Sequence, residues 1–243
     1  MLTPIIIYQD DDILVINKPS GLVVNRAESV KAETLQDWVE KNIKLDIKTG
    51  KLEEAFSKRS GIVHRLDKDT SGVLVIAKNS KAFLNLQKQF KLRKVEKKYL
   101  SLVHGKVEPK IGDIKMPLAR QLTDRKKFTV RLGGRSSATY YKVVKRFLKN
   151  ERFFSLLEVK PMTGRTHQIR VHLKHIGYPL VADPIYLGTK RLLEDKKWCQ
   201  RLFLHALNLK FFHPTSGKQK EFKAEIPKIL ATVLSKLNEK KEI

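Results

Sequence analysis

Two polar clusters in the sequence contain side chains of the kinds that catalyse reactions. The first is His64-Arg65-Leu66-Asp67-Lys68-Asp69-Thr70-Ser71-Gly72, which leads into the apolar run Val73–Ala77. Asp67 stands between Arg65 and Lys68, whose positive charge favours an ionised carboxylate, the form that acts as a nucleophile or base. The same spacing fits an ordinary salt-bridge partner equally well.

The second cluster is Thr163-Gly164-Arg165-Thr166-His167-Gln168-Ile169-Arg170-Val171-His172, which opens a helix predicted over Thr166–Ile176. Thr166 can cap this helix, and the helix N-terminus together with Arg165 would attract an anion. Arg170 lies beside the apolar stripe rather than opposite it, so its guanidinium is shielded and able to hold a carboxylate through two hydrogen bonds. The alternative is a solvated basic helix.

Asp69 and three histidines have simpler explanations than catalysis. The side chain of Asp69 can close an Asx turn on the backbone that follows it, which is a structural role. His167, His172 and His175 invite a metal site, but neither an acidic residue nor zinc-protease spacing accompanies them. We therefore expect no metal.

The charge of the chain indicates its partner. Its 243 residues include 50 Lys plus Arg against 25 Asp plus Glu, a formal net charge of +25. Basic side chains that neutralise phosphates release condensed counterions, so nucleic acid is the expected partner. An anionic membrane is the rival, but the basic residues are spread along the chain and no long amphipathic segment dominates.

The chain has the composition of a folded, unexported protein. Its 41% of hydrophobic residues can form a core, whereas no apolar run approaches the roughly 18 residues of a membrane span. The N-terminus lacks the features of a signal peptide, so we expect a cytoplasmic protein. Cys199, the only cysteine in the sequence, cannot form an internal disulfide and is expected to be buried.

The elements that must position these clusters are short strands and helices without strict alternation. Strands are predicted at Ile5–Tyr8, Ile13–Ile16, Val73–Ala77, Tyr99–Val103, Ala138–Phe147, Phe153–Val159, Leu202–Phe212 and Glu221–Ala224. Besides the helix at Thr166–Ile176, the periodicity predicts helices from Thr34 to Ile43, from 80 to 93 and from Ile226 to Leu237, with Thr34 and Ser80 as possible caps. Polar residues 47–61 are expected to form a surface loop, and the basic residues 106–135 long hairpins or loops. The whole, 1–243, is expected to be a single α+β domain around a mixed, mainly antiparallel sheet.

The first cluster resembles the signature of the RluA family of pseudouridine synthases. Further stretches resemble other motifs of that family in the same order, from about residue 10 to residue 227. They are Asn17-Lys18-Pro19-Ser20-Gly21, Lys98 to Gly105, Thr163 to Tyr186, Leu204-His205-Ala206 and Phe212-His213-Pro214. Several separate motifs in order make the resemblance specific.

The resemblance implies an isomerase that converts uridine to pseudouridine in ribosomal RNA, transfer RNA or both, without a cofactor. Asp67 is then the catalytic nucleophile, Tyr99 the active-site tyrosine and Arg170 the partner that pairs with Asp67. Contacts with the substrate or RNA are expected from His64, Arg65, Arg165 and Lys18. Weaker candidates for phosphate contacts in the basic hairpin region are Lys115, Arg120, Arg125, Lys126 and Lys127.

The sequence departs from the family pattern in a few places. Ser101 and Ser137 stand where alanine is common, and Ala182 replaces a glycine that usually precedes Asp183-Pro184. Because glycine permits backbone angles that alanine resists, the backbone of the Ala182 loop is expected to be the part that can differ from the family pattern. The first motif begins about twelve residues in, so we expect the S4 RNA-binding module of many family members to be absent.

Two other classes of protein fit part of the pattern. A noncatalytic RNA-binding protein would share the charge but would not need Asp67, Tyr99 and Arg170 together. An N-glycosylase could use an aspartate too, but it would release free base. Nothing in the sequence requires a protein partner or more than a monomer.

Overall fold

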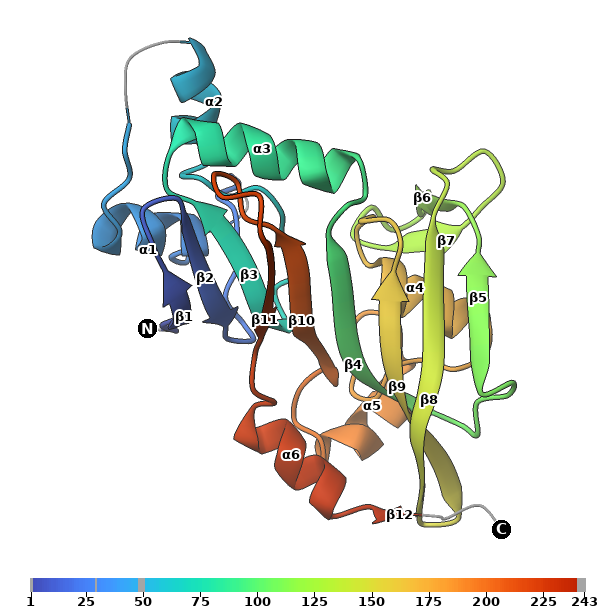
Figure 1. The fold of residues 1–243 in the computed structure, drawn as a ribbon. Helices are drawn as coiled ribbons and strands as arrows, with labels where there is room; N and C mark the ends of the chain where they lie inside the picture. Colours follow the sequence, from blue (N-terminus) through green and yellow to red (C-terminus); the bar gives the residue numbers. More distant parts are fainter. Residues whose placement is uncertain (1, 29, 48–50, 240–243) are drawn as a thin grey trace. The chain divides into compact units, whose positions relative to one another are not determined.

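The chain divides into two compact units in a computed structural model that describes residues 2–28, 30–47 and 51–239. Unit 1 combines Met1–Lys97 with Ala206–Glu225, and unit 2 combines Lys98–His205 with Ile226–Ile243. Both units contain strands and helices, which confirms the α+β class (Figure 1). The expectation of a single domain over 1–243 stays a prediction, and each unit is described on its own.

Unit 1 is built on a sheet in which β1 pairs antiparallel with β2, β2 with β3, and β10 with β11, while β10 lies next to β3. The strands are β1 (Ile5–Gln9), β2 (Ile13–Lys18), β3 (Ser71–Ala77), β10 (Leu204–Phe212) and β11 (Gln219–Lys223). All seven residues of β3 are buried, as the predicted apolar strand required. The polar cluster that precedes this strand is therefore attached to a segment that packing holds in place.

The helices of unit 1 are α1 (Leu35–Asn42), α2 (Lys51–Lys58) and α3 (Ser80–Lys91). For α1 the prediction is confirmed, since Thr34 and Asp37 form a reciprocal capping box and Leu35, Trp38 and Val39 are buried. For α3 the helix is confirmed but its cap is Asn79, which accepts the N–H of Ala82, and not Ser80.

The surface loop predicted over residues 47–61 is wrong for its second half, because α2 forms there. Phe56 is fully buried and packs edge-on against Phe83 of α3, with the ring centroids 5.8 Å apart. Leu52, Ala55 and Phe56 stand at i, i+3 and i+4, which is helical spacing, but the polar residues around them favour a loop. Residues 48–50 of the predicted loop lie outside the described residues.

In unit 2 the strands β4, β9, β8 and β12 pair antiparallel in this order, and β5 pairs with the other half of the β8 edge. The strands are β4 (Glu96–His104), β5 (Ile111–Lys115), β8 (Ala138–Lys149), β9 (Arg152–Pro161) and β12 (Asn238–Glu239), with β6 (Leu118–Arg120) and β7 (Phe128–Val130) forming a separate hairpin. The hairpins confirm the prediction for residues 106–135.

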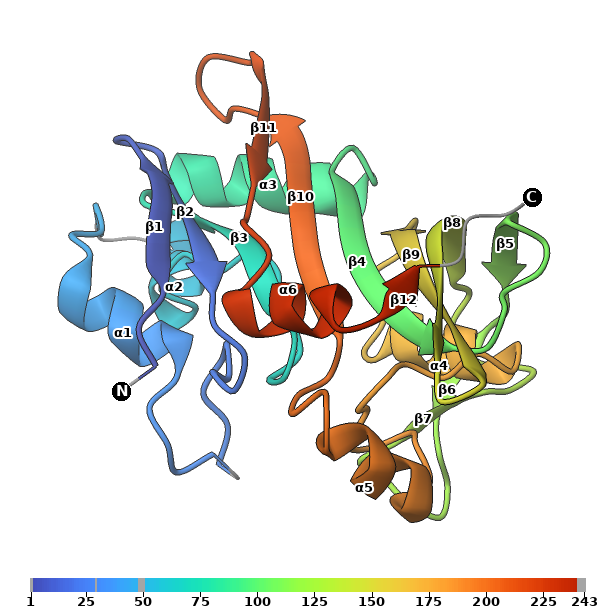
Figure 2. The same cartoon turned by 90° about the horizontal axis from the view of Figure 1, so that it is seen from below.

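The helices of unit 2 are α4 (Gln168–His175), α5 (Thr189–Lys196) and α6 (Lys228–Ser235), and α6 leads directly into β12 (Figure 2). Pro227 precedes the first turn of α6, where its missing N–H costs nothing. The sequence analysis did not predict α5. Among the described residues, no helix has the length and apolar content that a membrane crossing requires.

Alternation along the strands of unit 2 creates two buried clusters. Leu100, Leu102 and Leu156 pack with Leu230 and Val233 of α6. The intervening positions contribute to a second cluster that receives Ile169 and Leu173 of α4. Cys199 is fully buried in the first cluster, as predicted, and burial raises the pKa of its thiol to about 11. The second cluster holds α4, the helix that carries Arg170.

Candidate active site

Asp67 lies at the start of a tight turn that leads into β3. The backbone N–H of Thr70 donates to the carbonyl of Asp67 at 3.1 Å. The Asp67 side chain is half-buried, whereas its neighbours Arg65 and Lys68 are exposed. The turn fixes the backbone of Asp67, and the half-buried side chain is still accessible to a substrate.

A second segment, residues 17–21, fixes this turn from the side. The hydroxyl of Ser20 donates to the carbonyl of Asp69 at 2.7 Å, and the N–H of Gly21 donates to the carbonyl of Lys68 at 2.8 Å. Lys18 adds a third contact by donating its ammonium to the same Lys68 carbonyl at 3.2 Å. The two motifs that lie about fifty residues apart in the sequence therefore act as one structural unit, which limits the movement of Asp67.

Lys18 is buried beneath this turn, and its predicted contact with RNA stays a prediction. Its side chain is fully buried, and its ammonium also donates to the carbonyls of Pro19 at 2.9 Å and Leu22 at 2.8 Å. An ammonium has three donors, and three carbonyl oxygens receive them. Lys18 thus organises the backbone around the Asp67 turn.

We expect Lys18→Met to destabilise the protein by about 2 kcal/mol or more, because the carbonyls of Pro19 and Leu22 lose this donor and that of Lys68 keeps only the N–H of Gly21. Urea unfolding followed by circular dichroism measures the change. The control is Lys68→Gln, which removes an exposed charge and keeps the backbone carbonyl, and should change stability by less than about 0.5 kcal/mol. Equal stability of the Lys18→Met protein and the wild type would contradict the assignment.

Gly72 ends the first cluster for a steric reason. Its φ is +123°, and a Cβ atom at this position would come within 2.2 Å of the carbonyl oxygen of Ala206 in β10. Only glycine combines this backbone angle with such a close approach. The contact ties the turn of Asp67 to the Leu204-His205-Ala206 stretch that the sequence analysis singled out.

His64 is half-buried and neutral in this environment. The N–H of Val75 donates to its Nε2 at 3.1 Å, so that nitrogen carries no proton, and the ring stacks on Phe90 at 4.6 Å between centroids. Burial, together with the nearby positive charge of Lys97, lowers the pKa of His64 to about 3. Burial also lowers the pKa of the Lys97 ammonium, to about 8. His64 therefore supports the first cluster, and its predicted contact with RNA stays a prediction.

The second cluster begins differently from the prediction. The residue that precedes α4 is His167 in a left-handed conformation, with φ of 57°, and not Thr166. Gln168 holds the loop in place of a cap: its Oε1 accepts the Thr163 hydroxyl at 2.6 Å and the N–H of Arg165 at 3.1 Å. This loop positions Arg165, whose Nε also donates to the carbonyl of Ser136. Its contact with RNA stays a prediction.

Arg170 holds a carboxylate through two hydrogen bonds, as its place on the helix predicted. Within unit 2 that carboxylate belongs to Asp183, whose two oxygens accept from Nε at 2.8 Å and Nη2 at 2.6 Å. Both side chains are at most 2% exposed. Asp183 also accepts the N–H groups of Ile185 and Tyr186. The ion pair therefore connects α4 to the loop that follows it. Sequence spacing alone could not single out this partner.

The Ala182 loop is held by a second buried carboxylate. Ala182 has a φ of +55°, the angle expected of the glycine that the family pattern favours there. Its N–H donates to Oδ2 of Asp195 at 2.7 Å, and the same oxygen lies 2.9 Å from Nε2 of His104. A left-handed alanine costs roughly 1–2 kcal/mol, which these buried contacts offset.

The three predicted catalytic residues lie in different units. Asp67 belongs to unit 1, whereas Tyr99 and Arg170 belong to unit 2. Tyr99 is half-buried on β4, opposite Val159 of β9, and packs against the cluster that holds α4. Arg65 is exposed next to Asp67. The assembly of Asp67, Tyr99 and Arg170 around one substrate stays a prediction.

The basic hairpin region is exposed to solvent. Arg120 of β6 lies over the ring of Phe128 at 5.5 Å, and Lys127 forms an ion pair with Asp124. The side chains of Lys115, Arg125 and Lys126 are exposed. These positions are compatible with phosphate contacts and with ordinary solvated charges.

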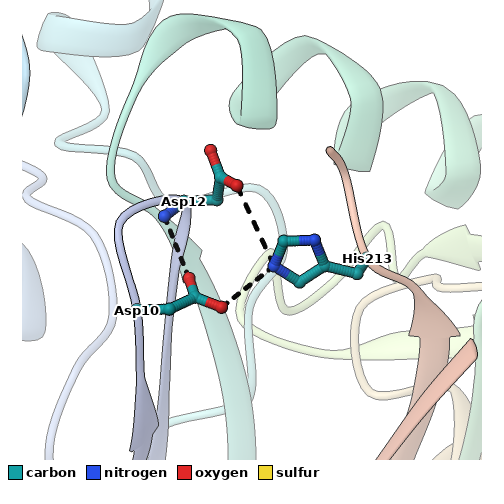
Figure 3. Close-up of side chains that lie close together, drawn as sticks. All are labelled: Asp10, Asp12 and His213. Carbon is teal, nitrogen blue, oxygen red and sulfur yellow. Dashed lines mark hydrogen bonds and ion pairs between the residues drawn. The ribbon is translucent and has the colours of Figure 1, made fainter. Parts of the chain in front are cut away.

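Among the described residues, one group has the composition of a metal site: Asp10, Asp12 and His213 (Figure 3). The N–H groups of Thr215 and Ser216 donate to Nδ1 of His213, and its Nε2 lies 2.9 Å from Oδ2 of Asp10. These contacts join the β1–β2 turn to the β10–β11 hairpin.

This contact makes stability depend on pH in a predictable direction. Burial alone would raise the pKa of Asp10, but hydrogen bonds from Ile13, Tyr8, Asp12 and His213 outweigh it and lower that pKa below its ordinary value of 3.8. The stabilisation from Asp10 is therefore complete above about pH 4 and is lost as the pH falls through the lowered value. In urea unfolding between pH 3 and pH 7, the Asp10→Asn protein should differ most from the wild type at neutral pH and least at pH 3. A constant difference would contradict this.

Comparison with known proteins places the chain in a family. Residues 12–175 match the family model described as RNA pseudouridylate synthase. An uncharacterized RNA pseudouridine synthase of Aquifex aeolicus is 45% identical over 239 residues, with 96% of this chain and 73% of that protein covered. The ribosomal large subunit pseudouridine synthase D of Zymomonas mobilis is 41% identical, with 91% and 69% covered.

A solved structure supports the same assignment. The human RNA pseudouridylate synthase domain containing 1 aligns with a TM-score of 0.73 at 26% identity, covering all of this chain and 91% of that one. The matched range 12–175 contains Asp67, Tyr99 and Arg170. The chain belongs to the RNA pseudouridylate synthase family and is an isomerase that converts uridine to pseudouridine in RNA.

Proposed function

We propose that this enzyme modifies uridine in ribosomal RNA and that Asp67 is its nucleophile. The observation that carries the proposal is the half-buried carboxylate of Asp67 on a turn held by the Lys18 segment, inside the range that matches the family. Relatives named ribosomal large subunit pseudouridine synthase C and D, at 35% to 41% identity, favour ribosomal RNA. Transfer RNA is the alternative substrate.

The reaction rearranges bonds within one nucleotide. The glycosidic bond between C1′ and N1 breaks, the uracil turns, and a new bond forms between C1′ and C5. The hydrogen on C5 leaves to solvent as a proton, and N1 takes up a proton in its place. Electrons and heavy atoms are conserved, so the reaction needs no redox cofactor.

Each proposed residue has a task that its chemistry allows. Asp67 attacks the nucleotide or stabilises charge as the glycosidic bond breaks. Arg170 directs the Asp67 carboxylate and favours its ionised form, while its bidentate contact with Asp183 fixes the guanidinium. Tyr99 stacks on the uracil and brings its hydroxyl near the reacting carbons.

The target uridine must leave its base stack before it can reach Asp67. Extrusion costs least in a loop or a distorted helix, so we propose a structured but locally open RNA site. Arg65 is exposed next to Asp67, and its planar guanidinium can fill the space that the base vacates. Arg165 and His64 are the proposed nearby contacts. The enzyme is proposed to act as a monomer.

Release of tritium tests the reaction directly. Large-subunit ribosomal RNA and transfer RNA are transcribed with uracil labelled at C5, and each is incubated with the purified protein. The proposed function predicts tritium in water from ribosomal RNA. Free labelled uracil would indicate a glycosylase. If neither tritiated water nor free uracil formed, the protein would only bind RNA. Release from transfer RNA alone would overturn the proposed substrate.

A further inference from the structure

A basic groove lies in unit 2, where the end of the Thr163 to Tyr186 stretch meets the start of α5. It has a volume of about 750 Å³ and is lined by residues from β9, α4, the loop after α4 and the start of α5. We call it the α5 groove. Four cationic side chains line it, namely Arg152, Lys174, Lys190 and Arg191, and all four are exposed.

The charge of the groove is strongly unbalanced. Glu194 is the one acidic residue that lines it, and it forms an ion pair with Arg152. The hydrogen bond from Arg152 lowers the pKa of Glu194, so this carboxylate is ionised at neutral pH. After this pair is set aside, three positive charges remain. They attract an anion that carries several charges.

The openness of this groove distinguishes it from a site for a small metabolite. Sites for small molecules are enclosed and bury most of the ligand, whereas this groove is open to solvent. Here the cationic side chains are themselves exposed, and the ammonium of Lys174 lies 5.7 Å over the ring of Tyr186, which supports its position at the groove. Exposed cations spread along a groove fit a chain of phosphates that passes through it.

We infer that the α5 groove binds the phosphate backbone of the RNA substrate. The inference rests on the proposed function, because it takes structured RNA as the substrate. It adds a contact surface that acts on affinity and on the placement of the RNA. It assigns no part in the bond rearrangement to these residues.

The test compares two triple variants that remove the same charge from unit 2. The groove variant is Lys174→Gln/Lys190→Gln/Arg191→Gln. The control is Lys142→Gln/Lys228→Gln/Lys236→Gln, whose lysines are also exposed but do not line the groove. The probe is the large-subunit ribosomal RNA transcript, and its Kd is measured by filter binding at several salt concentrations.

The groove variant should raise the Kd at about 0.1 M salt by roughly tenfold or more, and the control by much less. The slope of log K against log salt should become shallower by roughly 2 to 3, because the variant neutralises fewer phosphates and releases fewer counterions. Equal effects of the two variants, or no effect of the groove variant, would overturn the inference. Glu194→Gln removes the negative charge of the groove and should lower the Kd for RNA.

Two measurements separate this inference from its alternatives. Titration of the wild type with inorganic phosphate tests for a site for small anions, and binding of phosphate without any effect of the groove variant on RNA would overturn the inference. Single-turnover tritium release at saturating protein should be the same for the groove variant and the wild type. Wild-type protein that releases no tritium would instead contradict the proposed function. The comparison of Kd values would still test whether the α5 groove binds RNA, because it does not depend on turnover.

Discussion

An Asp67→Asn protein should form pseudouridine at least roughly 10⁴-fold more slowly than the wild type and should still bind RNA. Asparagine keeps the size and the hydrogen-bonding shape of the side chain but removes its negative charge and its nucleophilicity. Loss of a catalytic nucleophile typically costs this much or more in turnover. Single-turnover tritium release measures the rate, and filter binding measures the Kd, which should change by less than about threefold.

Asp69→Asn is the matched control, since the two aspartates lie on the same turn and the substitution is the same. We interpret Asp69 as structural, so this variant should lose little of the rate. If Asp69→Asn abolished the reaction while Asp67→Asn kept it, the assignment of the nucleophile would be wrong. Circular dichroism must show that both variants are folded.

Arg170→Met should destabilise the protein by about 3–5 kcal/mol. The substitution leaves Asp183 almost completely buried without the guanidinium that balances its charge, and an uncompensated buried charge is among the most costly defects in a protein. Urea unfolding at neutral pH measures the loss. Because Arg170 is also the proposed partner of Asp67, activity per folded molecule should fall as well.

A double-mutant cycle separates the charge from the packing. Asp183→Asn removes the negative charge but keeps an oxygen for the N–H groups of Ile185 and Tyr186. In combination with Arg170→Met it should cost clearly less than the sum of the two single substitutions, because neither charge is then left alone. Additive losses would show that the ion pair is not the source of the destabilisation.

The elements that the sequence predicted well are those whose side chains follow a simple period. The apolar stripe at Leu35, Trp38 and Val39 predicted α1, and a run of apolar residues predicted β3. By contrast, the apolar pattern of α2 is short and lies in a polar stretch, and the buried residue of α5 is a charged one, Asp195. Apolar periodicity is a weak signal for a short helix in a polar stretch and for a helix whose buried residue is a carboxylate.

The candidate site shows the same division. The clusters around Asp67 and Arg170 could be found because their residues are close in sequence. Asp183 could not be identified as the partner of Arg170, nor Lys18 as a buried donor, because tertiary structure brings those contacts together. A lysine in a polar motif is usually exposed, so its burial is not visible in the sequence.

The division of the chain into two units also affects the order in which they form during synthesis. Unit 1 needs β10 and β11 from residues 206–225 beside its first 97 residues, and unit 2 receives α6 and β12 from the segment after them. Multidomain chains commonly fold one contiguous unit after another as they leave the ribosome. Here neither unit is contiguous, so unit 1 stays incomplete until Glu225 has been translated and unit 2 until the segment after it follows. A nascent chain stalled near residue 200 would therefore leave the edge of β3 that pairs with β10 without its partner strand, and an unpaired strand edge is prone to aggregation.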